Sequence, residues 1–281
     1  EKDKQEYLTH LANIRAESKK AISDENKTVL IRINEQLDEL IRKAVWAIPG
    51  TWVQHFRELA EKGNFTNQQE AEYYIKKGVI AIEKDAQLAQ HLHKEFENTN
   101  VRVICADILN YPLNELPPNT KVIGNLPYNA ATPIITKILE HKNLFREMYI
   151  TVQLEYGGRL AAKPHTKSYG AFSCFVQYHT NPKILMKIRN SAFQPIPKVQ
   201  SCFLHLEIPK KPKYTVKNKA FLFKIIQTCF KQRRKKINNS LAGILNKKEI
   251  PQLLDNLNID QKLRAENIGL EQYVQIANAV S

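Results

Sequence analysis

The residues with the clearest chemical signature are Asn125-Leu126-Pro127-Tyr128. The Asn125 side-chain oxygen and the Leu126 carbonyl can both accept hydrogen bonds from an exocyclic amine, and Pro127 stiffens the backbone. The Tyr128 ring offers a face on which a base turned out of its helix can stack. This order of residue types suits the binding of a planar amine. The alternative is an ordinary Asn-x-Pro turn, which four residues alone do not exclude.

The neighbouring residues place this motif between a strand and a helix. Lys121–Gly124 reads as a short buried strand. Thr132 can cap the helix that follows, and Pro133 suits the first turn of that helix. The helix has an apolar face made of Ile134, Ile135, Ile138 and Leu139. A strand that passes into a helix is the usual place for a ligand in an open α/β sheet.

Two earlier strands show the same pattern of a buried run followed by an acid. Val79–Ile82 ends at Glu83 and is followed by a helix from about Asp85 to Phe96, and Val101–Cys105 ends at Asp107. This alternation predicts a parallel sheet with helices on both faces.

The polar residues at these strand ends predict a nucleotide site. Glu83, Asp107 and Asn125 follow successive strands, and the carboxyl ends of parallel strands form one edge, where nucleotides bind. An acid after the second strand of a nucleotide fold typically holds ribose hydroxyls, and an Asx residue at the next strand can accept from an adenine amine. Each is also a common turn residue, so the prediction depends on their shared register.

The rest of the chain extends the sheet and adds helices. Further strands are expected at Met148–Gln153, Ala171–Tyr178, Lys183–Ile188 and Cys202–Ile208, closing the sheet with antiparallel pairing. Phe193, on an extended loop with two prolines, is either a second stacking surface beside Tyr128 or a hydrophobic anchor. We predict three regions: a mainly helical segment at 1–77, an α/β domain at 78–209 and a small all-α domain at 210–281.

Positive charge is concentrated in one segment of a chain whose formal net charge is +14. Residues 208–248 contain thirteen lysines and arginines and no acid. Within this segment we expect a helix at Phe230–Leu241 whose basic side chains face solvent. These basic side chains include the consecutive residues Arg233, Arg234, Lys235 and Lys236. A local field of this size suits nucleic acid, and the alternative is a solvated basic surface.

Composition narrows the class of protein. The chain has 281 residues, of which 43% are hydrophobic, which is enough for one large domain or a large and a small one. Four scattered cysteines without a CxxC pair argue against a zinc site or a disulfide framework and for a reducing compartment. No apolar run approaches a membrane span, and Glu1–Lys4 does not resemble a signal peptide. We therefore expect a cytoplasmic monomer with no metal site.

Residues 79–281 resemble the ribosomal RNA adenine dimethyltransferase family, which modifies two adjacent adenines near the end of small-subunit rRNA. The resemblance rests on VIAIEKD (79–85), CADIL (105–109), IGNLPYNAATPI (123–134), AKPHTKSYGAFS (162–173), AFQPIPKVQS (192–201), FKQRRKKINNSL (230–241) and RAENIGLEQYV (264–274). The macrolide-resistance methyltransferases of large-subunit rRNA share the fold, but RRKKINNSL, RAEN and the leucine of NLPY favour the small-subunit branch.

The resemblance implies a Rossmann-like methyltransferase sheet with a small C-terminal all-α domain, and S-adenosylmethionine as cofactor. It implies that Glu83, with Lys84, holds the cofactor ribose and that Asp107, with Ile108, holds its adenine amine. Asn125–Tyr128 would bind the target base, with Asn125 also beside the cofactor. Phe193 and the four basic residues at 233–236 would contact RNA of the small ribosomal subunit.

The front of the chain departs from the family. A glycine-rich loop, E-x-G-x-G-x-G, is expected about 25 residues before Glu83, because glycine lets the backbone approach the methionine end of the cofactor. Residues 51–59 (TWVQHFREL) contain no G-x-G, and a Q-N-F-L segment is also absent. This part has diverged with loss of methyl transfer, has been replaced, or is atypical in sequence. A non-catalytic relative, such as a ribosome assembly or transcription factor, would keep the fold and the basic segment without using the cofactor.

Overall fold

The structure, a computed structural model, describes residues 79–98, 101–193 and 197–280. With those gaps, the described residues divide into two compact units, 79–111 with 190–198 and 112–189 with 199–280. The helices expected in residues 1–77 lie outside the described part of the chain. Among the residues that are described, no helix has both the length and the apolar content needed to cross a membrane.

The first unit contains a pair of parallel strands and one helix. β1 (Val79–Glu83) pairs with β2 (Val101–Cys105), and α5 (Ala86–Glu95) connects them. Asp85 caps α5, because its side chain accepts hydrogen bonds from the first backbone N–H groups of the helix. These elements confirm the predicted strand–helix–strand order. The small core between them consists of Ala89, Phe96, Val101 and Val103.

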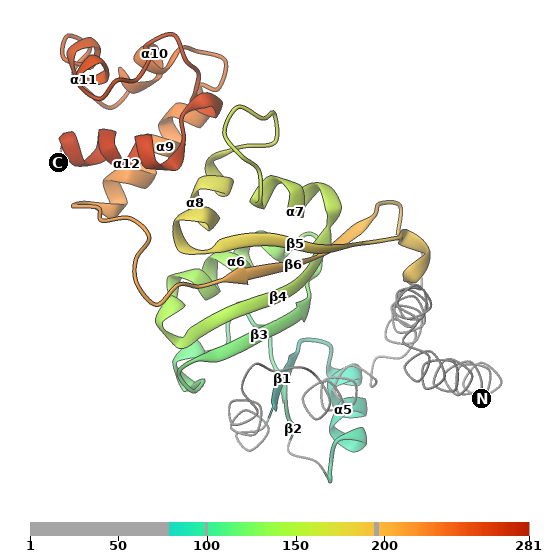
Figure 1. The fold of residues 1–281 in the computed structure, drawn as a ribbon. Helices are drawn as coiled ribbons and strands as arrows, with labels where there is room; N and C mark the ends of the chain where they lie inside the picture. The colour runs from blue at the N-terminus through green and yellow to red at the C-terminus, as the bar shows by residue number, and fades with distance from the viewer. Residues whose placement is uncertain (1–78, 99–100, 194–196, 281) are drawn as a thin grey trace, which may run out of the picture. The chain divides into compact units, whose positions relative to one another are not determined.

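The second unit is built on a mixed sheet of four strands (Figure 1). The strands run in the order β3-β4-β6-β5, in which only β3 and β4 are parallel. The predicted antiparallel closure of the sheet is therefore confirmed. The bounds of the strands are Thr120–Asn125 for β3, Phe145–Gln153 for β4, Asn181–Ile188 for β5 and Ser201–Glu207 for β6.

One face of this sheet is fully buried along its two central strands, β4 and β6. The strands contribute Met148, Ile150, Val152, Cys202, Leu204 and Leu206, none of which is exposed. Helix α7 (Leu154–Leu160) packs against β4, β5 and β6, and α6 (Ala131–Glu140) connects β3 towards β4. Gly157 of α7 allows the close approach, since a Cβ there would clash with the Cys202 sulfur.

The other face carries a charged cluster that joins three strands. The buried Glu147 carboxylate of β4 contacts Lys121 Nζ of β3 at 2.9 Å and His205 Nε2 of β6 at 3.1 Å, and it accepts a hydrogen bond from Tyr149. Burial alone would raise the pKa of Glu147, but the bonds from Lys121, Tyr149 and His205 lower it overall. A buried carboxylate needs such partners to remain charged.

The strand predicted at Ala171–Tyr178 is wrong, because these residues form helix α8 (Ala171–His179). The Ser173 hydroxyl accepts a hydrogen bond from the Gly170 backbone N–H at the start of the helix. The buried positions are Ser173, Cys174, Val176 and His179. Ser173, Val176 and His179 are spaced three residues apart, which suits a helix. Periodicity alone does not separate a short apolar run in a strand from a buried helix.

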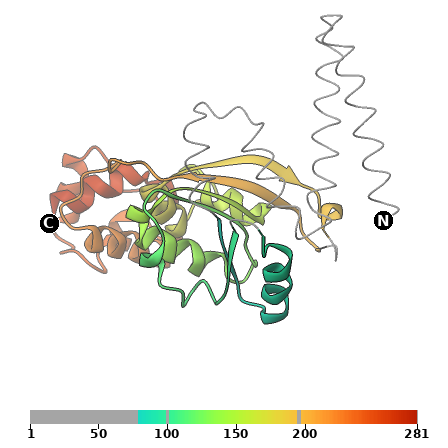
Figure 2. The same ribbon diagram turned by 90° about the horizontal axis from the view of Figure 1, so that it is seen from below.

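The C-terminal helices gather beside α8 (Figures 1 and 2). They share one core with Ala162, Tyr169 and Cys174, which precede or belong to α8. The expected helix at Phe230–Leu241 is wrong, because a turn at residues 232–235 and the bridge residue Lys236 separate α9 from α10. The helices are α9 (Lys219–Lys231), α10 (Ile237–Leu241), α11 (Ile250–Asn256) and α12 (Leu270–Ala279). Short 3-10 turns lie at Leu113–Glu115, Lys142–Leu144, Asn190–Ala192 and Ala265–Asn267.

Two adjacent glycines of α7 give a matched test of the packing between α7 and the sheet. Gly157→Ala should lower the free energy of unfolding by about 1–3 kcal/mol, because the new methyl group overpacks the contact with Cys202. Gly158→Ala meets no atom within 4 Å and should raise it by up to about 1 kcal/mol, the gain of alanine over glycine in a helix. Urea denaturation followed by circular dichroism measures both.

The same contact predicts coupling between Gly157 and Cys202. Replacing Cys202 by alanine removes the sulfur that the new methyl group meets, so the double variant should recover part of the stability that Gly157→Ala removes. Additive effects of the two substitutions would show that this contact does not set the distance between α7 and β6.

Candidate active site

The NLPY motif forms the connection between β3 and α6. Asn125 is the last residue of β3, and its side chain is exposed, whereas the Leu126 side chain is buried. The Leu126 backbone N–H donates to the Thr151 carbonyl of β4 at 3.1 Å. The Ala130 N–H donates to the Pro127 carbonyl at 2.9 Å and closes the turn. The two predicted amine acceptors are thus held on a turn fixed at both ends.

Tyr128 is held by its hydroxyl group. This hydroxyl lies 2.8 Å from Ser201 Oγ, and Ser201 is fully buried at the start of β6. Tyr128 itself is 38% exposed. An aromatic side chain anchored at one end and open to solvent elsewhere suits the predicted stacking role.

The predicted cap at Thr132 is wrong. Helix α6 begins at Ala131, and no side chain caps it. The Thr132 hydroxyl instead lies 2.9 Å from the Tyr156 hydroxyl of α7, and burial raises the pKa of Tyr156. Tyr156 was not predicted as a site residue. The available signal was its place shortly after the end of β4, the strand that pairs with β3.

The two predicted cofactor carboxylates lie at the ends of neighbouring strands in the first unit. Glu83 Oε1 accepts a hydrogen bond from the Asp85 backbone N–H at 2.8 Å, and Asp107 Oδ1 accepts one from Leu109 at 2.9 Å. Lys84 Nζ donates to Asp107 Oδ2 at 2.8 Å and links the two strand ends. This hydrogen bond, with the attraction of the carboxylate, raises the pKa of Lys84.

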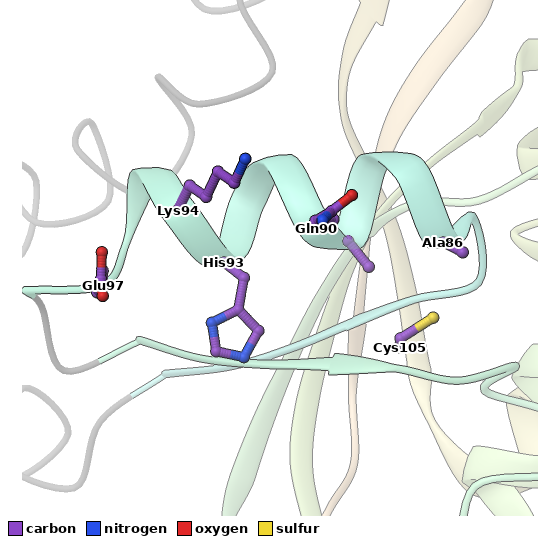
Figure 3. Close-up of a pocket in the computed structure, with 7 residues that line it drawn as sticks. Ala86, Gln90, His93, Lys94, Glu97 and Cys105 are labelled. Atoms are coloured by element: carbon purple, nitrogen blue, oxygen red, sulfur yellow. The ribbon is translucent and has the colours of Figure 1, made fainter.

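A pocket of about 380 Å³ runs along α5 in the same unit (Figure 3). Figure 3 shows His93 and Cys105 on the same side of the helix. Neither Glu83 nor Asp107 lines this pocket. The expected cofactor residues therefore lie outside it, Glu83 at the end of β1 and Asp107 just after β2.

The structure brings the predicted residues together in two groups. Glu83, Lys84, Asp107 and Ile108 belong to the first unit, and Asn125–Tyr128 belongs to the second. Phe193 is half-buried in the first unit, and its stacking beside Tyr128 stays a prediction. Among the described residues, no group of three or more His, Cys, Asp or Glu side chains is arranged to hold a metal ion.

The four basic residues at 233–236 differ in their surroundings. Arg233 is ion-paired with Glu266, and its guanidinium also donates to the Lys167 carbonyl. The other three, Arg234, Lys235 and Lys236, are exposed. Arg233 thus joins the turn to the loop that precedes α8, and the other three carry the charge available to a ligand.

Solved structures show the same fold. A dimethyladenosine transferase from Plasmodium falciparum superposes with a TM-score of 0.61 at 22% identity, covering 71% of this chain and 80% of that chain. The 23S rRNA methyltransferase ErmE superposes with a TM-score of 0.57 at 21% identity, with the same coverage. The predicted α/β methyltransferase fold with a helical C-terminal part is confirmed.

Sequence comparison places the chain in a family. A protein named ribosomal RNA small subunit methyltransferase A from Alkaliphilus oremlandii is 39% identical over 71% of this chain and 73% of that protein. The protein of the same name from Clostridioides difficile is 37% identical over 74% and 75%. The model of the family described as ribosomal RNA adenine dimethylase matches residues 60–281. These matches confirm the prediction of an rRNA adenine dimethyltransferase over that of a non-catalytic relative. The chain belongs to the ribosomal RNA adenine dimethylase family.

Proposed function

We propose that this protein is a monomeric, cytoplasmic enzyme that dimethylates the exocyclic amine of adenines in small-subunit ribosomal RNA, with S-adenosylmethionine as methyl donor. The observation that carries the proposal is the turn after β3, where Asn125 is exposed, Leu126 is fixed to β4 and Tyr128 is anchored through Ser201. The small-subunit substrate is supported by the names of the relatives.

The turn supplies orientation rather than a strong base. The lone pair of an adenine amine is delocalised into the ring, so the amine is a poor nucleophile. Accepting its two N–H groups at Asn125 Oδ1 and the Leu126 carbonyl would localise that lone pair and direct it. Stacking on Tyr128 would hold the base out of its helix. The chemistry that S-adenosylmethionine supplies when bound is an electrophilic methyl group.

The residues at the ends of β1 and β2 fit the adenosine half of the cofactor. Glu83 Oε1 is occupied by a backbone N–H, which leaves Oε2 to accept from a ribose hydroxyl. Asp107, oriented by Lys84 and followed by Ile108, would accept from the adenine amine. The window where the family has its glycine-rich loop, residues 51–59, lies outside the described residues.

RNA would be held by the basic segment of the C-terminal region, residues 210–281. Arg234, Lys235 and Lys236 are exposed on one turn, and burying three neighbouring cations would carry a prohibitive desolvation cost. Exposed cations of this kind attract phosphates and release condensed counterions when they bind. Arg233 contributes to structure instead, through its pairing with Glu266.

The first functional prediction concerns the amine acceptor. Asn125→Ala should lower the rate of methyl transfer about a hundredfold, the typical cost of losing one aligned acceptor in a catalytic site, and should change RNA affinity by no more than a few-fold. Asn129→Ala is the matched control, because Asn129 is an exposed asparagine four residues further on. Transfer of a radiolabelled methyl group to small-subunit ribosomal RNA measures the rate. An Asn125→Ala enzyme with more than half of the original rate would contradict the assigned role.

The second functional prediction concerns the cofactor. Glu83→Ala and Asp107→Ala should each weaken S-adenosylmethionine binding about tenfold or more, as expected for a hydrogen bond to a charged group. Glu97→Gln removes an exposed acid of the same unit away from the strand ends and should have no effect. Calorimetric titration measures all three. If the unmodified protein does not bind the cofactor at millimolar concentration, the enzymatic proposal fails and a non-catalytic RNA-binding protein remains.

The third functional prediction separates Arg233 from its neighbours. Replacing Arg234, Lys235 and Lys236 by glutamine should flatten the slope of log K for RNA against log salt by about two to three units, close to one for each phosphate that the variant no longer neutralises. Arg233→Gln should instead lower the melting temperature, because it breaks the pair with Glu266. Cofactor binding should be unchanged in both variants. An unchanged slope in the triple variant would mean that RNA binds elsewhere.

A further inference from the structure

The C-terminal region contains a polar pocket that the methyl-transfer reaction does not use. Its volume is about 380 Å³, and it lies between the start of α10 and the segment that contains α11 and the residues after it. Every lining side chain is polar or charged. The lining consists of Lys236, Asn238, Asn239, Asp255, Asp260, Gln261 and Lys262.

The backbone around this pocket is fixed by two connections. Lys236 and Arg264 form an isolated antiparallel bridge, and the Ile237 N–H donates to the Leu263 carbonyl at 2.6 Å. Ile237 is fully buried beneath them. Lys236 and Lys262 therefore flank the pocket from two backbone segments that are held side by side.

The acids of the pocket are bonded within the protein, whereas the lysines are not. Asp255 accepts a hydrogen bond from the Gln261 amide at 2.8 Å, and Asp260 accepts one from the Lys262 backbone N–H at the same distance. Within the described residues, neither ammonium group has an ion-pair partner, and the Asn239 amide makes no hydrogen bond. The groups left for a ligand are two cations and one amide, with carboxylate lone pairs beside them.

This set of groups selects among ligand classes. A metal ion would be repelled by the two ammonium groups, and a bare phosphate would meet two carboxylates. A ribose–phosphate unit satisfies both, because its phosphate pairs with lysine and its 2′-hydroxyl donates to and accepts from amide and carboxylate groups. The lining has no aromatic side chain, which argues against a stacked base.

We propose that this pocket binds one ribose–phosphate unit of RNA, with the phosphate between Lys236 and Lys262 and the 2′-hydroxyl at Asn239, and so distinguishes RNA from DNA. The proposal rests on the proposed function only in taking RNA as the substrate. DNA has no 2′-hydroxyl and would leave Asn239 without a partner, so its deoxyribose–phosphate unit would gain only the pairing of the phosphate with the two lysines.

A substitution in the full chain that removes no charge tests the contact between Asn239 and the 2′-hydroxyl. Asn239→Ala should weaken binding of a single-stranded RNA oligonucleotide about fivefold, the loss expected for one net hydrogen bond, and should leave binding of the same DNA sequence unchanged. The salt slope should not change, because no charge is removed. Gln275→Ala, an exposed amide of α12 away from the pocket, is the control. Fluorescence anisotropy without cofactor measures each affinity. Equal losses for RNA and DNA would overturn the proposal.

Two charge-matched pairs test the phosphate contact. Lys236→Gln with Lys262→Gln and Lys247→Gln with Lys248→Gln each remove two exposed charges, but only the first pair lines the pocket. The first pair should lower the preference for RNA over DNA, whereas the second should weaken both to the same degree. Indistinguishable pairs would reduce the pocket to part of a general basic surface.

The assay also separates this proposal from the enzymatic one. If the protein discriminates RNA from DNA as predicted but transfers no methyl group, the pocket proposal stands and the proposed reaction fails. If the protein methylates RNA but its RNA affinity is unaffected by Asn239→Ala, the proposed reaction stands and the pocket proposal fails.

Discussion

The pairing of β3 with β4 is the constraint on which the NLPY turn depends. It fixes Asn125 opposite Thr151, and the Thr151 carbonyl then holds the backbone of Leu126. Glu147 secures the same pairing further along the strands, because its carboxylate contacts Lys121 of β3 and His205 of β6. Removing any of its partners would leave a charge buried without full compensation. An ionic cluster on the face of the sheet thus supports the strand pairing that carries the NLPY turn.

Ser201 and Tyr156 extend this support to two side chains in and just after the NLPY turn, Tyr128 and Thr132. Ser201 holds the Tyr128 hydroxyl from the adjoining strand β6, and Tyr156 holds Thr132 in the first turn of α6. Both contacts are made by hydroxyl groups, so a phenylalanine would fill the same space without fixing the position. The turn is consequently shaped before any substrate arrives, which is the condition for transition-state stabilisation by fixed dipoles.

The local sequence pattern was sufficient to predict the three strands that are followed by a polar residue of the candidate site, β1, β2 and β3. Asn125 follows a short run that contains two β-branched residues, Val122 and Ile123, and a run of this kind that ends at turn residues is typical of a strand. It was insufficient at Ala171–His179, where an apolar run shorter than three turns suits a strand as well as a helix. Tertiary contacts decide such cases, and here α8 has Ser173, Cys174, Val176 and His179 on its buried side.

Pairings between residues distant in sequence were not predictable from a single chain. Thr132 has the residue type of a helix cap, yet its hydroxyl bonds to Tyr156, which lies 24 residues away. Arg233 carries the same positive charge as its basic neighbours, yet it pairs with Glu266, which lies 33 residues away in the sequence. Spacing gives no information on either contact. The NLPY residues were predictable because their chemistry is contained in four consecutive positions.

The shared core of α8 and the C-terminal helices has a geometric consequence. Ala162, Tyr169 and Cys174 pack with residues of α9 to α12, and Arg233 closes the same junction through Glu266. The basic turn and the NLPY turn therefore belong to one compact unit, and the protein, not the RNA, sets the span between them. A nucleic acid that contacts both turns must have a backbone segment and an unstackable adenine separated by the distance between the two turns. Because the distance between the two turns is fixed within the unit, the protein would select its target by the shape of folded RNA as much as by the identity of the base.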